Sequence, residues 1–156
     1  MARLAGEKAA YIAERNLDAV VIGADTIVVL PDVIPTILGK PTDRVDAVAM
    51  LRALQDREHV VYTGFAVITA DRAVNVSRVV RTKVHFKPLS DELITAYVST
   101  GEPMDKAGSY GVQGIGGAFV KRVDGSFTNV VGLPLAELHD ELLAIGVCSA
   151  SDLVKN

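Results

Sequence analysis

The spacing of apolar positions along the chain predicts four helices. Apolar residues recur every three or four positions in four segments, which lie at 2–15, after Asp43, from Ser90 to Gly101 and from Leu135 to Gly146. This is the spacing of a helix with one buried face. Asp43 and Ser90 are residue types that cap helix N-termini, and glycine commonly follows a helix C-terminus. We therefore expect a helix in each segment.

Runs of β-branched and aromatic residues predict the strands. Residues 19–23 and 26–30 are short apolar runs of the kind that buried strands show. Residues 59–69 and 74–86 favour a long hairpin whose second strand has one solvated face, and 118–123 favours a further strand. The order is then helix, strand pair, helix, hairpin, helix, strand and helix. It indicates an α/β fold, with a mixed sheet that carries helices on its faces.

Two polar loops remain between these elements. Residues 31–41 hold three prolines and a glycine, and residues 101–117 hold six glycines together with acidic, basic and amide side chains. Binding and catalytic residues commonly lie on loops that a rigid scaffold positions. We expect these two loops to form a cleft.

Composition and charge narrow the class of protein. At 156 residues, with 49% hydrophobic content, the chain can form one hydrophobic core, and we expect a single domain over 1–156. The single Cys148 excludes an internal disulfide and favours a reducing compartment, so we expect a cytoplasmic protein. A net charge of −3 offers no basic surface to a nucleic-acid polymer. Charged residues and prolines interrupt the apolar stretches well short of a membrane span, so no membrane association is expected.

Asp25 is the first candidate for chemistry, because it lies between two apolar runs where a strand would carry Val or Ile. Such a carboxylate is either hydrogen-bonded within the fold or exposed to a cleft, where a metal ion or a water molecule uses it. Lys40 and Lys106 lie in the two loops, where the backbone can approach a ligand closely. Together the three residues indicate a phosphate and metal site. The alternative is that the lysines are solvated surface charges.

Several common catalytic arrangements do not occur in the sequence. Gly39-Lys40 is followed by proline, so the chain has no phosphate-binding P-loop motif. The glycines of 108–117 precede a predicted strand, whereas a dinucleotide-binding fingerprint precedes a helix. The three histidines are too scattered for metal-ligand spacing, and no cysteine or serine has an evident activating partner.

Six longer motifs carry a resemblance to a known family. They are GADT at 23–26, LGKP at 38–41, HVVYTG at 59–64, TGEP at 100–103, DKAGSYGVQG at 105–114 and NVVGLP at 129–134. In order and spacing they resemble the Maf family of nucleoside triphosphate pyrophosphatases, over nearly the whole chain. The resemblance implies a fold related to the inosine triphosphate pyrophosphatases, with an elongated mixed sheet, a cleft between two lobes and often a homodimer. It implies hydrolysis of a nucleoside triphosphate to the monophosphate and pyrophosphate.

The resemblance also assigns roles to individual residues. It implies that Asp25 is the proton acceptor. Hydrolysis at the α-phosphorus usually also needs a divalent metal, Mg²⁺ or Mn²⁺, and Asp25 can instead help hold that metal. It implies a role in substrate choice for Thr26 and Gln113, and the glycine-rich loop looks like that of the branch acting on dTTP and UTP. An amide such as Gln113 can both donate to and accept from the edge of a pyrimidine. The remaining substrate-binding candidates are Lys8, Lys40, Glu102, Asp105 and Lys106.

The resemblance begins inside the first helix. Family members open with a strand and a Ser-x-Ser-Pro-Arg-Arg loop before the helix that carries the Lys-Ala matched here by Lys8-Ala9. We therefore expect a single Maf-like domain that lacks this strand and loop. Two alternatives to a dTTP and UTP pyrophosphatase remain open. One is a catalytically weak nucleotide-binding regulator linked to septum formation, and the other is a 7-methyl-GTP pyrophosphatase.

Overall fold

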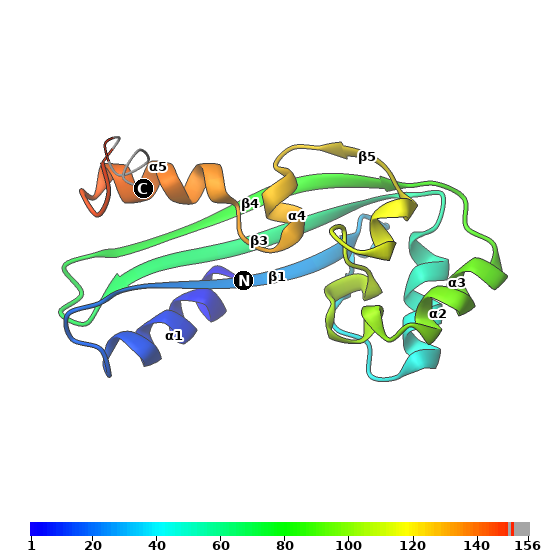
Figure 1. Cartoon of the computed structure of the whole chain (residues 1–156), viewed down its shortest axis with the longest axis horizontal. Coiled ribbons are helices and arrows are strands. Elements are labelled where there is room, and N and C mark those ends of the chain that lie inside the picture. Colours follow the sequence, from blue (N-terminus) through cyan, green and yellow to red (C-terminus); the bar gives the residue numbers. More distant parts are fainter. Residues whose placement is uncertain (150, 152–156) are drawn as a thin grey trace.

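The computed structural model describes residues 1–149 and 151, which form an elongated sheet flanked by helices (Figure 1). The sheet has five strands in the order β2–β1–β3–β4–β5. The strands are β1 Val20–Leu30, β2 Thr36–Leu38, β3 Glu58–Thr69, β4 Asn75–Phe86 and β5 Val120–Asp124. The helices are α1 Ala2–Ala13, α2 Arg44–Leu54, α3 Asp91–Ser99, α4 Phe127–Val131 and α5 Leu135–Ala144. Three short 3₁₀ helices occupy the glycine-rich segment, namely η1 Glu102–Asp105, η2 Ala107–Ser109 and η3 Ile115–Phe119.

The α/β class and the four predicted helices are confirmed, and two helix caps form as expected. The Asp43 carboxylate accepts a hydrogen bond from the Asp46 N–H, and the Ser90 hydroxyl accepts one from the Leu93 N–H. The predicted hairpin corresponds to β3 and β4. No helix within 1–149 and 151 combines the length and the apolar character that crossing a membrane requires.

Three details of the sheet differ from the sequence prediction. The two apolar runs at 19–23 and 26–30 form the single strand β1, because β3 pairs with it without a break from Val20 to Val29. The loop at 31–41 contains the short strand β2, which pairs with the end of β1. All four pairings in the described residues are antiparallel, whereas a mixed sheet was expected. For β3 and β4 the direction follows from the tight turn that joins them.

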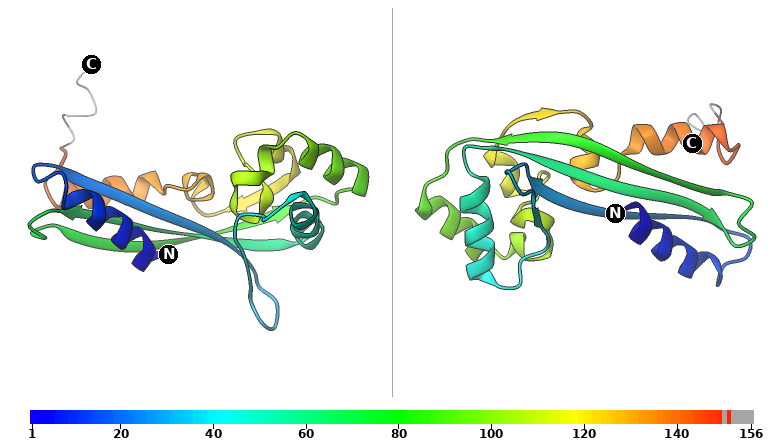
Figure 2. Two further views of the ribbon diagram at one scale, coloured as in Figure 1. Left: turned by 90° about the horizontal axis from the view of Figure 1, so that it is seen from below. Right: turned by 180° about the vertical axis from the view of Figure 1, so that it is seen from behind.

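The long strands β1, β3 and β4 join two lobes (Figures 1 and 2). In the first lobe, α1 and α5 cover opposite faces of the sheet. Neighbouring strand residues point to opposite faces, and accordingly Ala66 and Ile68 pack against α1 while Phe65 and Val67 pack with Leu138 of α5. The second lobe gathers α2, α3 and the 3₁₀ helices.

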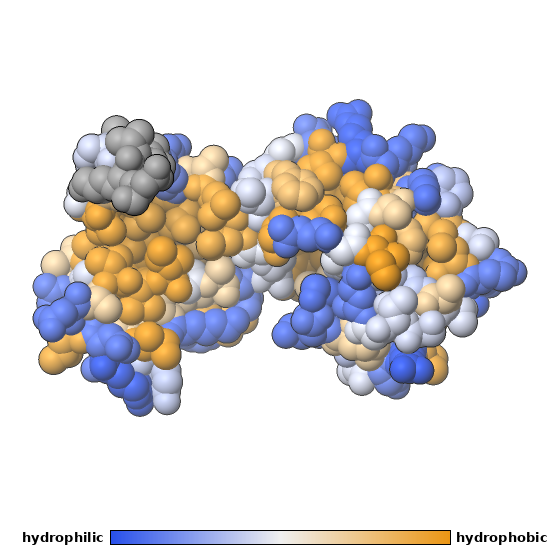
Figure 3. All heavy atoms as spheres, in the orientation of Figure 1, coloured by the Kyte–Doolittle hydropathy of each residue, from blue (hydrophilic) through white to orange (hydrophobic). Residues whose placement is uncertain are grey.

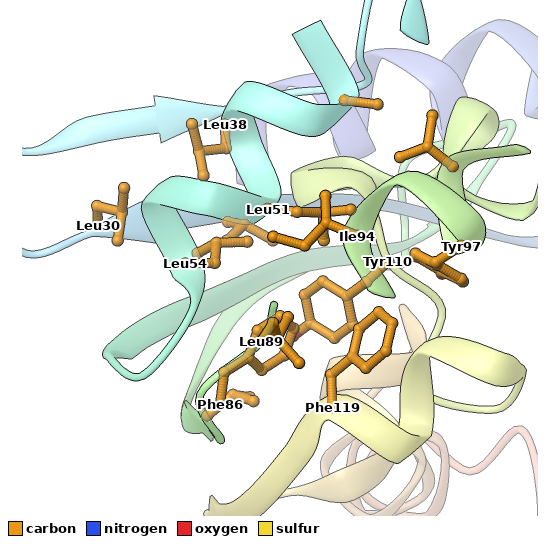
Figure 4. Packing of buried hydrophobic residues seen from close by; sticks show 14 of the residues in the cluster. Leu30, Leu38, Leu51, Leu54, Phe86, Leu89, Ile94, Tyr97, Tyr110 and Phe119 are labelled. Carbon is orange, nitrogen blue, oxygen red and sulfur yellow. The ribbon is translucent and has the colours of Figure 1, made fainter. Parts of the chain in front are cut away.

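The largest buried cluster lies in the second lobe (Figure 4). It contains the fully buried aliphatic side chains of Leu51 and Leu54 in α2 and Ile94 in α3. These side chains belong to the same cluster as several aromatic residues. The aromatic rings meet edge to face, with centroids 4.7 Å apart for Phe86 and Tyr110, and 4.8 Å apart for Tyr97 and Phe119. Such pairs add about 0.5–1.5 kcal/mol each beyond the area they bury. The cluster therefore supplies a firm base for the glycine-rich segment.

Helix α1 lies unusually close to the sheet. Its buried face is made of alanines, and it crosses strand positions occupied by glycines. A Cβ atom on Gly23 would lie 2.4 Å from the Ala5 carbonyl oxygen, and one on Gly64 would lie 2.5 Å from the Ala2 nitrogen. Only glycine permits this approach.

A buried polar network fastens α4 to the sheet. The Asn129 side-chain amide donates to the Val61 carbonyl oxygen at 3.2 Å and to the Thr82 hydroxyl at 2.9 Å. The Thr63 hydroxyl donates to the Asn129 carbonyl oxygen at 3.0 Å. Because buried polar groups are costly without partners, these bonds hold α4 and the residues that follow it at one place on the sheet.

We predict that Gly23→Ala destabilises the protein while Gly6→Ala does not. The methyl group at residue 23 would force α1 away from β1, and overpacking of this kind costs about 1–3 kcal/mol. Gly6 lies in the same helix with open space around its Cβ position, so alanine there should add up to about 1 kcal/mol of helix propensity. Urea unfolding followed by circular dichroism measures both changes. Equal losses in the two variants would contradict the close packing.

Candidate active site

A cleft lies between the two lobes, and Figure 3 shows the notch that separates them. It consists of two recesses of about 280 Å³ and about 300 Å³. The recesses adjoin each other because Lys106, Tyr110, Val130 and Val131 line both.

Every residue that the sequence singled out for substrate or metal binding lines one of these recesses. Most of these residues line the first recess, namely Lys8, Asp25, Thr26, Lys40, Asp105 and Lys106. Glu102 and Gln113 line the second recess. The fold therefore brings residues from α1, β1, the proline-rich loop and the glycine-rich segment into one cleft.

Asp25 lies in the middle of β1, opposite Gly64 of β3. Its side chain is 18% exposed, and its Oδ1 accepts a hydrogen bond from the Lys8 Nζ at 2.7 Å. The carboxylate therefore has a partner in the fold and also lines the cleft. The pairing depends on the close approach of α1, which carries Lys8.

Thr26, the next residue, connects the cleft to the network that fastens α4. Its hydroxyl lies 2.9 Å from the Thr63 hydroxyl, which in turn donates to the Asn129 carbonyl oxygen. Gly132, just after α4, lies beside Thr26 in the same recess. The position of Thr26 is therefore coupled to that of the wall formed by α4.

The two loop lysines lie on segments that are bonded to each other. The Gly108 N–H donates to the Gly39 carbonyl oxygen at 3.0 Å. Gly108 has a φ of +69°, and a Cβ atom there would lie 2.9 Å from a methyl group of Val28, so the contact requires glycine. This link holds the backbone beside Lys40 against the backbone that follows Lys106.

Charges within the first recess are mixed, with lysines in excess. Lys106 forms an ion pair with Asp105. The hydrogen bond from Lys106 lowers the pKa of the Asp105 carboxyl, and the positive charges of Lys106 and Lys40 lower it further. Three lysines and two aspartates line this recess. The lining therefore has an excess of one positive charge, which favours an anionic ligand.

The Glu102 carboxylate is engaged by the glycine-rich segment. It accepts hydrogen bonds from the Ile115 N–H at 2.9 Å, from the Gly116 N–H at 3.0 Å and from the Tyr97 hydroxyl at 2.9 Å. Desolvation alone would raise the pKa of the Glu102 carboxyl, but these bonds outweigh it and lower the pKa. Its charge is therefore used to order the wall of the second recess.

Sequence reasoning assigned no role to Tyr110, although this residue lines both recesses. Its hydroxyl lies 2.9 Å from Nε2 of His59, which is fully buried beneath the cleft. Burial lowers the pKa of the His59 imidazole to about 4, so the ring is neutral at pH 7. Tyr110 belongs to the DKAGSYGVQG motif, and this motif was the sequence feature that could have identified it as a residue of the cleft.

The donor atoms of the cleft fit a divalent cation only together with a ligand that brings oxygens of its own. Among residues 1–149 and 151, no group of three or more His, Cys, Asp or Glu side chains could enclose a metal ion. Asp25 and Asp105 line the same recess. Mg²⁺ is commonly held by one or two carboxylates together with water and the phosphates of a substrate. The cleft fits a cation of that kind, and it does not form a closed cage.

The fold and the cleft define an α/β protein whose candidate site has more lysines than aspartates in its lining. A family model described as "Maf-like protein" matches residues 1–145. The chain therefore belongs to the Maf family.

Three curated relatives are similar along most of the chain. A dTTP/UTP pyrophosphatase of Desulfotalea psychrophila is 49% identical over 94% of this chain and 74% of its own length. One of Pelotomaculum thermopropionicum is 53% identical over 92% of this chain and 73% of its own length. One of Geobacter sulfurreducens is 52% identical over 92% of this chain and 74% of its own length.

We predict that the protein loses stability as the pH falls from about 6.5 towards 4, and that His59 causes part of this loss. The imidazole pKa is about 4 in the folded protein and about 6.5 in an unfolded chain. Between these values the unfolded chain binds a proton that the folded protein does not, so acid favours unfolding. A difference of this size corresponds to at most about 3 kcal/mol.

Urea unfolding of the wild type and of His59→Gln at several pH values tests this. The glutamine amide does not titrate and can still bond to Tyr110. The wild type should lose more stability than the variant between pH 7 and pH 4.5. Parallel pH profiles for the two proteins would contradict the assignment.

Proposed function

We propose that this protein hydrolyses nucleoside triphosphates, with dTTP and UTP as its main substrates, to the monophosphate and pyrophosphate. The observation that carries the proposal is the Lys8–Asp25 pair in a cleft that also contains Lys40 and Lys106. Gln113 in the adjoining recess and the names of three relatives about half identical to this chain support the choice of nucleotide.

The first recess is suited to the triphosphate. Lys40 and Lys106 would bind phosphate oxygens and offset the charge that develops on the departing pyrophosphate. Asp25 would accept a proton from the water molecule whose oxygen attacks the α-phosphorus, and the bond from that phosphorus to the bridging oxygen would break. Lys8, hydrogen-bonded to Asp25, would orient the carboxylate.

The second recess is suited to the base. Gln113 offers both an amide donor and a carbonyl acceptor, which match the alternating acceptors and donor on the edge of thymine or uracil. Val130 and Val131 line both recesses and would contact the apolar faces of the nucleoside. Thr26 and Asp105 would contact the substrate from the first recess, and Glu102 lies in the wall of the second.

A divalent cation, Mg²⁺ or Mn²⁺, belongs to the proposal. As an alternative to accepting the proton, Asp25 would help hold this cation together with phosphate oxygens, and the cation would neutralise charge on the triphosphate. We further infer that the protein acts in the cytoplasm, which its cysteine usage favours, and as a homodimer, which the family resemblance favours. Light scattering that gives the mass of one chain would contradict the dimer.

We predict that Asp25→Asn lowers the release of pyrophosphate from dTTP by a factor of about 10²–10⁴, because asparagine cannot take the proton. The variant keeps the size of the side chain and should keep the fold. Asp18→Asn, in the exposed turn before β1, provides a control with the same change in charge and should retain wild-type turnover. Pyrophosphate release in the presence of Mg²⁺ or Mn²⁺ measures both. Turnover near the wild-type level in Asp25→Asn would exclude the base role.

We predict that Gln113→Ala and Lys40→Gln affect selectivity differently. Loss of the Gln113 amide in Gln113→Ala should reduce kcat/KM for dTTP and UTP by about tenfold, because the amide contacts the base. The value of kcat/KM for other triphosphates should change little. Loss of the Lys40 ammonium in Lys40→Gln should weaken the binding of all triphosphates alike, because this group contacts phosphates.

A panel of triphosphates that includes 7-methyl-GTP measures these effects. If 7-methyl-GTP were the best substrate, the role of Gln113 would be wrong. Nucleotide binding without turnover in the wild type would favour the regulatory alternative over the enzyme.

A further inference from the structure

The glycine-rich segment is held by a side chain that lines the second recess. Glu102, in η1, accepts hydrogen bonds from the backbone N–H groups of Ile115 and Gly116, in η3. Bonds from backbone N–H groups to a carboxylate are charge-assisted and stronger than bonds between neutral groups. One side chain therefore ties the start of the segment to its end.

The packing around this carboxylate leaves no room for another side chain. A Cβ atom on Gly114 would lie 2.5 Å from the Glu102 carboxylate, and one on Gly111 would lie 3.3 Å from it. A Cβ atom on Gly116 would lie 2.6 Å from the Tyr97 hydroxyl. The glycines thus serve to bring the backbone against Glu102 and Tyr97, rather than to make the segment flexible.

Tyr97 provides a second point of attachment. Its hydroxyl donates to Glu102 Oε1 at 2.9 Å and accepts a hydrogen bond from the Gly111 N–H at 3.2 Å. The ring itself is 2% exposed and packs edge to face against Phe119. Because the ring is fixed in the core, the hydroxyl is a rigid anchor for Gly111.

The two attachments enclose Gln113. It is the third residue of the segment 111–114, whose Gly114 N–H donates to the Gly111 carbonyl oxygen at 3.2 Å and closes a tight turn. Tyr97 holds the first residue of this turn, and Glu102 holds the two residues that follow it. The exposed Gln113 side chain therefore projects from a turn that is fixed at both ends.

We propose that Glu102 and Tyr97 are positioning residues that set the place of Gln113 and thereby the preference among nucleobases. This replaces the expectation that Glu102 binds the substrate directly, and it rests on the function proposed above. Glu102 acts on the base through Gln113 and leaves the chemistry at Asp25 unchanged.

Amide hydrogen exchange followed by NMR tests the attachment without any substrate. In Glu102→Gln the new NH₂ group faces one of the two backbone donors, so the amides of Ile115 and Gly116 should exchange at least about tenfold faster. In Tyr97→Phe the ring stays in the core and only the hydroxyl is lost, so the Gly111 amide should exchange faster. Glu14→Gln, exposed at the end of α1, is the charge-matched control and should leave all three amides unchanged.

Steady-state kinetics tests the consequence for the substrate. Glu102→Gln should raise KM for dTTP and UTP by about tenfold, which is the loss of roughly one well-made hydrogen bond, while kcat stays within about threefold. In the Gln113→Ala background the same substitution should change KM by less than about twofold, because its effect passes through the missing amide.

Each outcome decides the proposal. Additive effects of Glu102→Gln and Gln113→Ala would overturn it in favour of direct substrate contact. Unchanged exchange at Ile115 and Gly116 would overturn the attachment itself. Should Glu102→Gln fail to fold, Tyr97→Phe with and without Gln113→Ala gives the same two tests. A wild type without activity would overturn the proposed function, whereas the exchange experiment would still decide whether these residues hold the turn.

Discussion

The pairing of β1 with β3 is the constraint on which the rest of the structure depends. The two strands run together from Val20–Thr69 to Val29–Val60, and this length of ladder passes from one lobe into the other. Asp25 lies near its middle, so the carboxylate reaches the cleft without being in a flexible loop. The glycines of the ladder then let α1 approach, which brings Lys8 to Asp25. A rigid strand and a closely packed helix thus define the central ion pair of the cleft.

Buried polar side chains hold the elements that line the cleft in place. Thr63, Thr82 and Asn129 are fully buried and bond to one another, so they fix α4 on the sheet, although Asn129 Oδ1 has no partner there. Nε2 of the buried His59 likewise bonds to the Tyr110 hydroxyl and fixes that side chain in the cleft lining. Such groups are costly unless satisfied, and once satisfied they specify a single arrangement. The walls of the cleft are therefore positioned by the core rather than by surface contacts.

Sequence patterns predicted those elements whose signals are local. Helices α2 and α3 follow from their capping residues and apolar spacing, and the β3–β4 hairpin follows from its alternation. Helix α4 was not predicted, although Ser126 caps it in the usual way, because five residues are too few to show periodicity. The continuity of β1 was missed for a different reason. An aspartate interrupts its apolar pattern, and only pairing with β3 keeps the strand extended there.

The residues of the cleft were also identifiable from the sequence. Asp25 interrupts two apolar runs, Lys40 and Lys106 lie in polar loops, and the remaining candidates matched a known family. What they do to one another was decided by the tertiary structure. Lys8 and Asp25 are 17 residues apart, and Glu102 and Gly116 are 14 apart. No local rule states that the first pair meets in the cleft or that the second ties down a turn. The sequence alone determined which chemical groups are available, and packing determined which are free for a ligand, since contacts between distant segments depend on the whole fold.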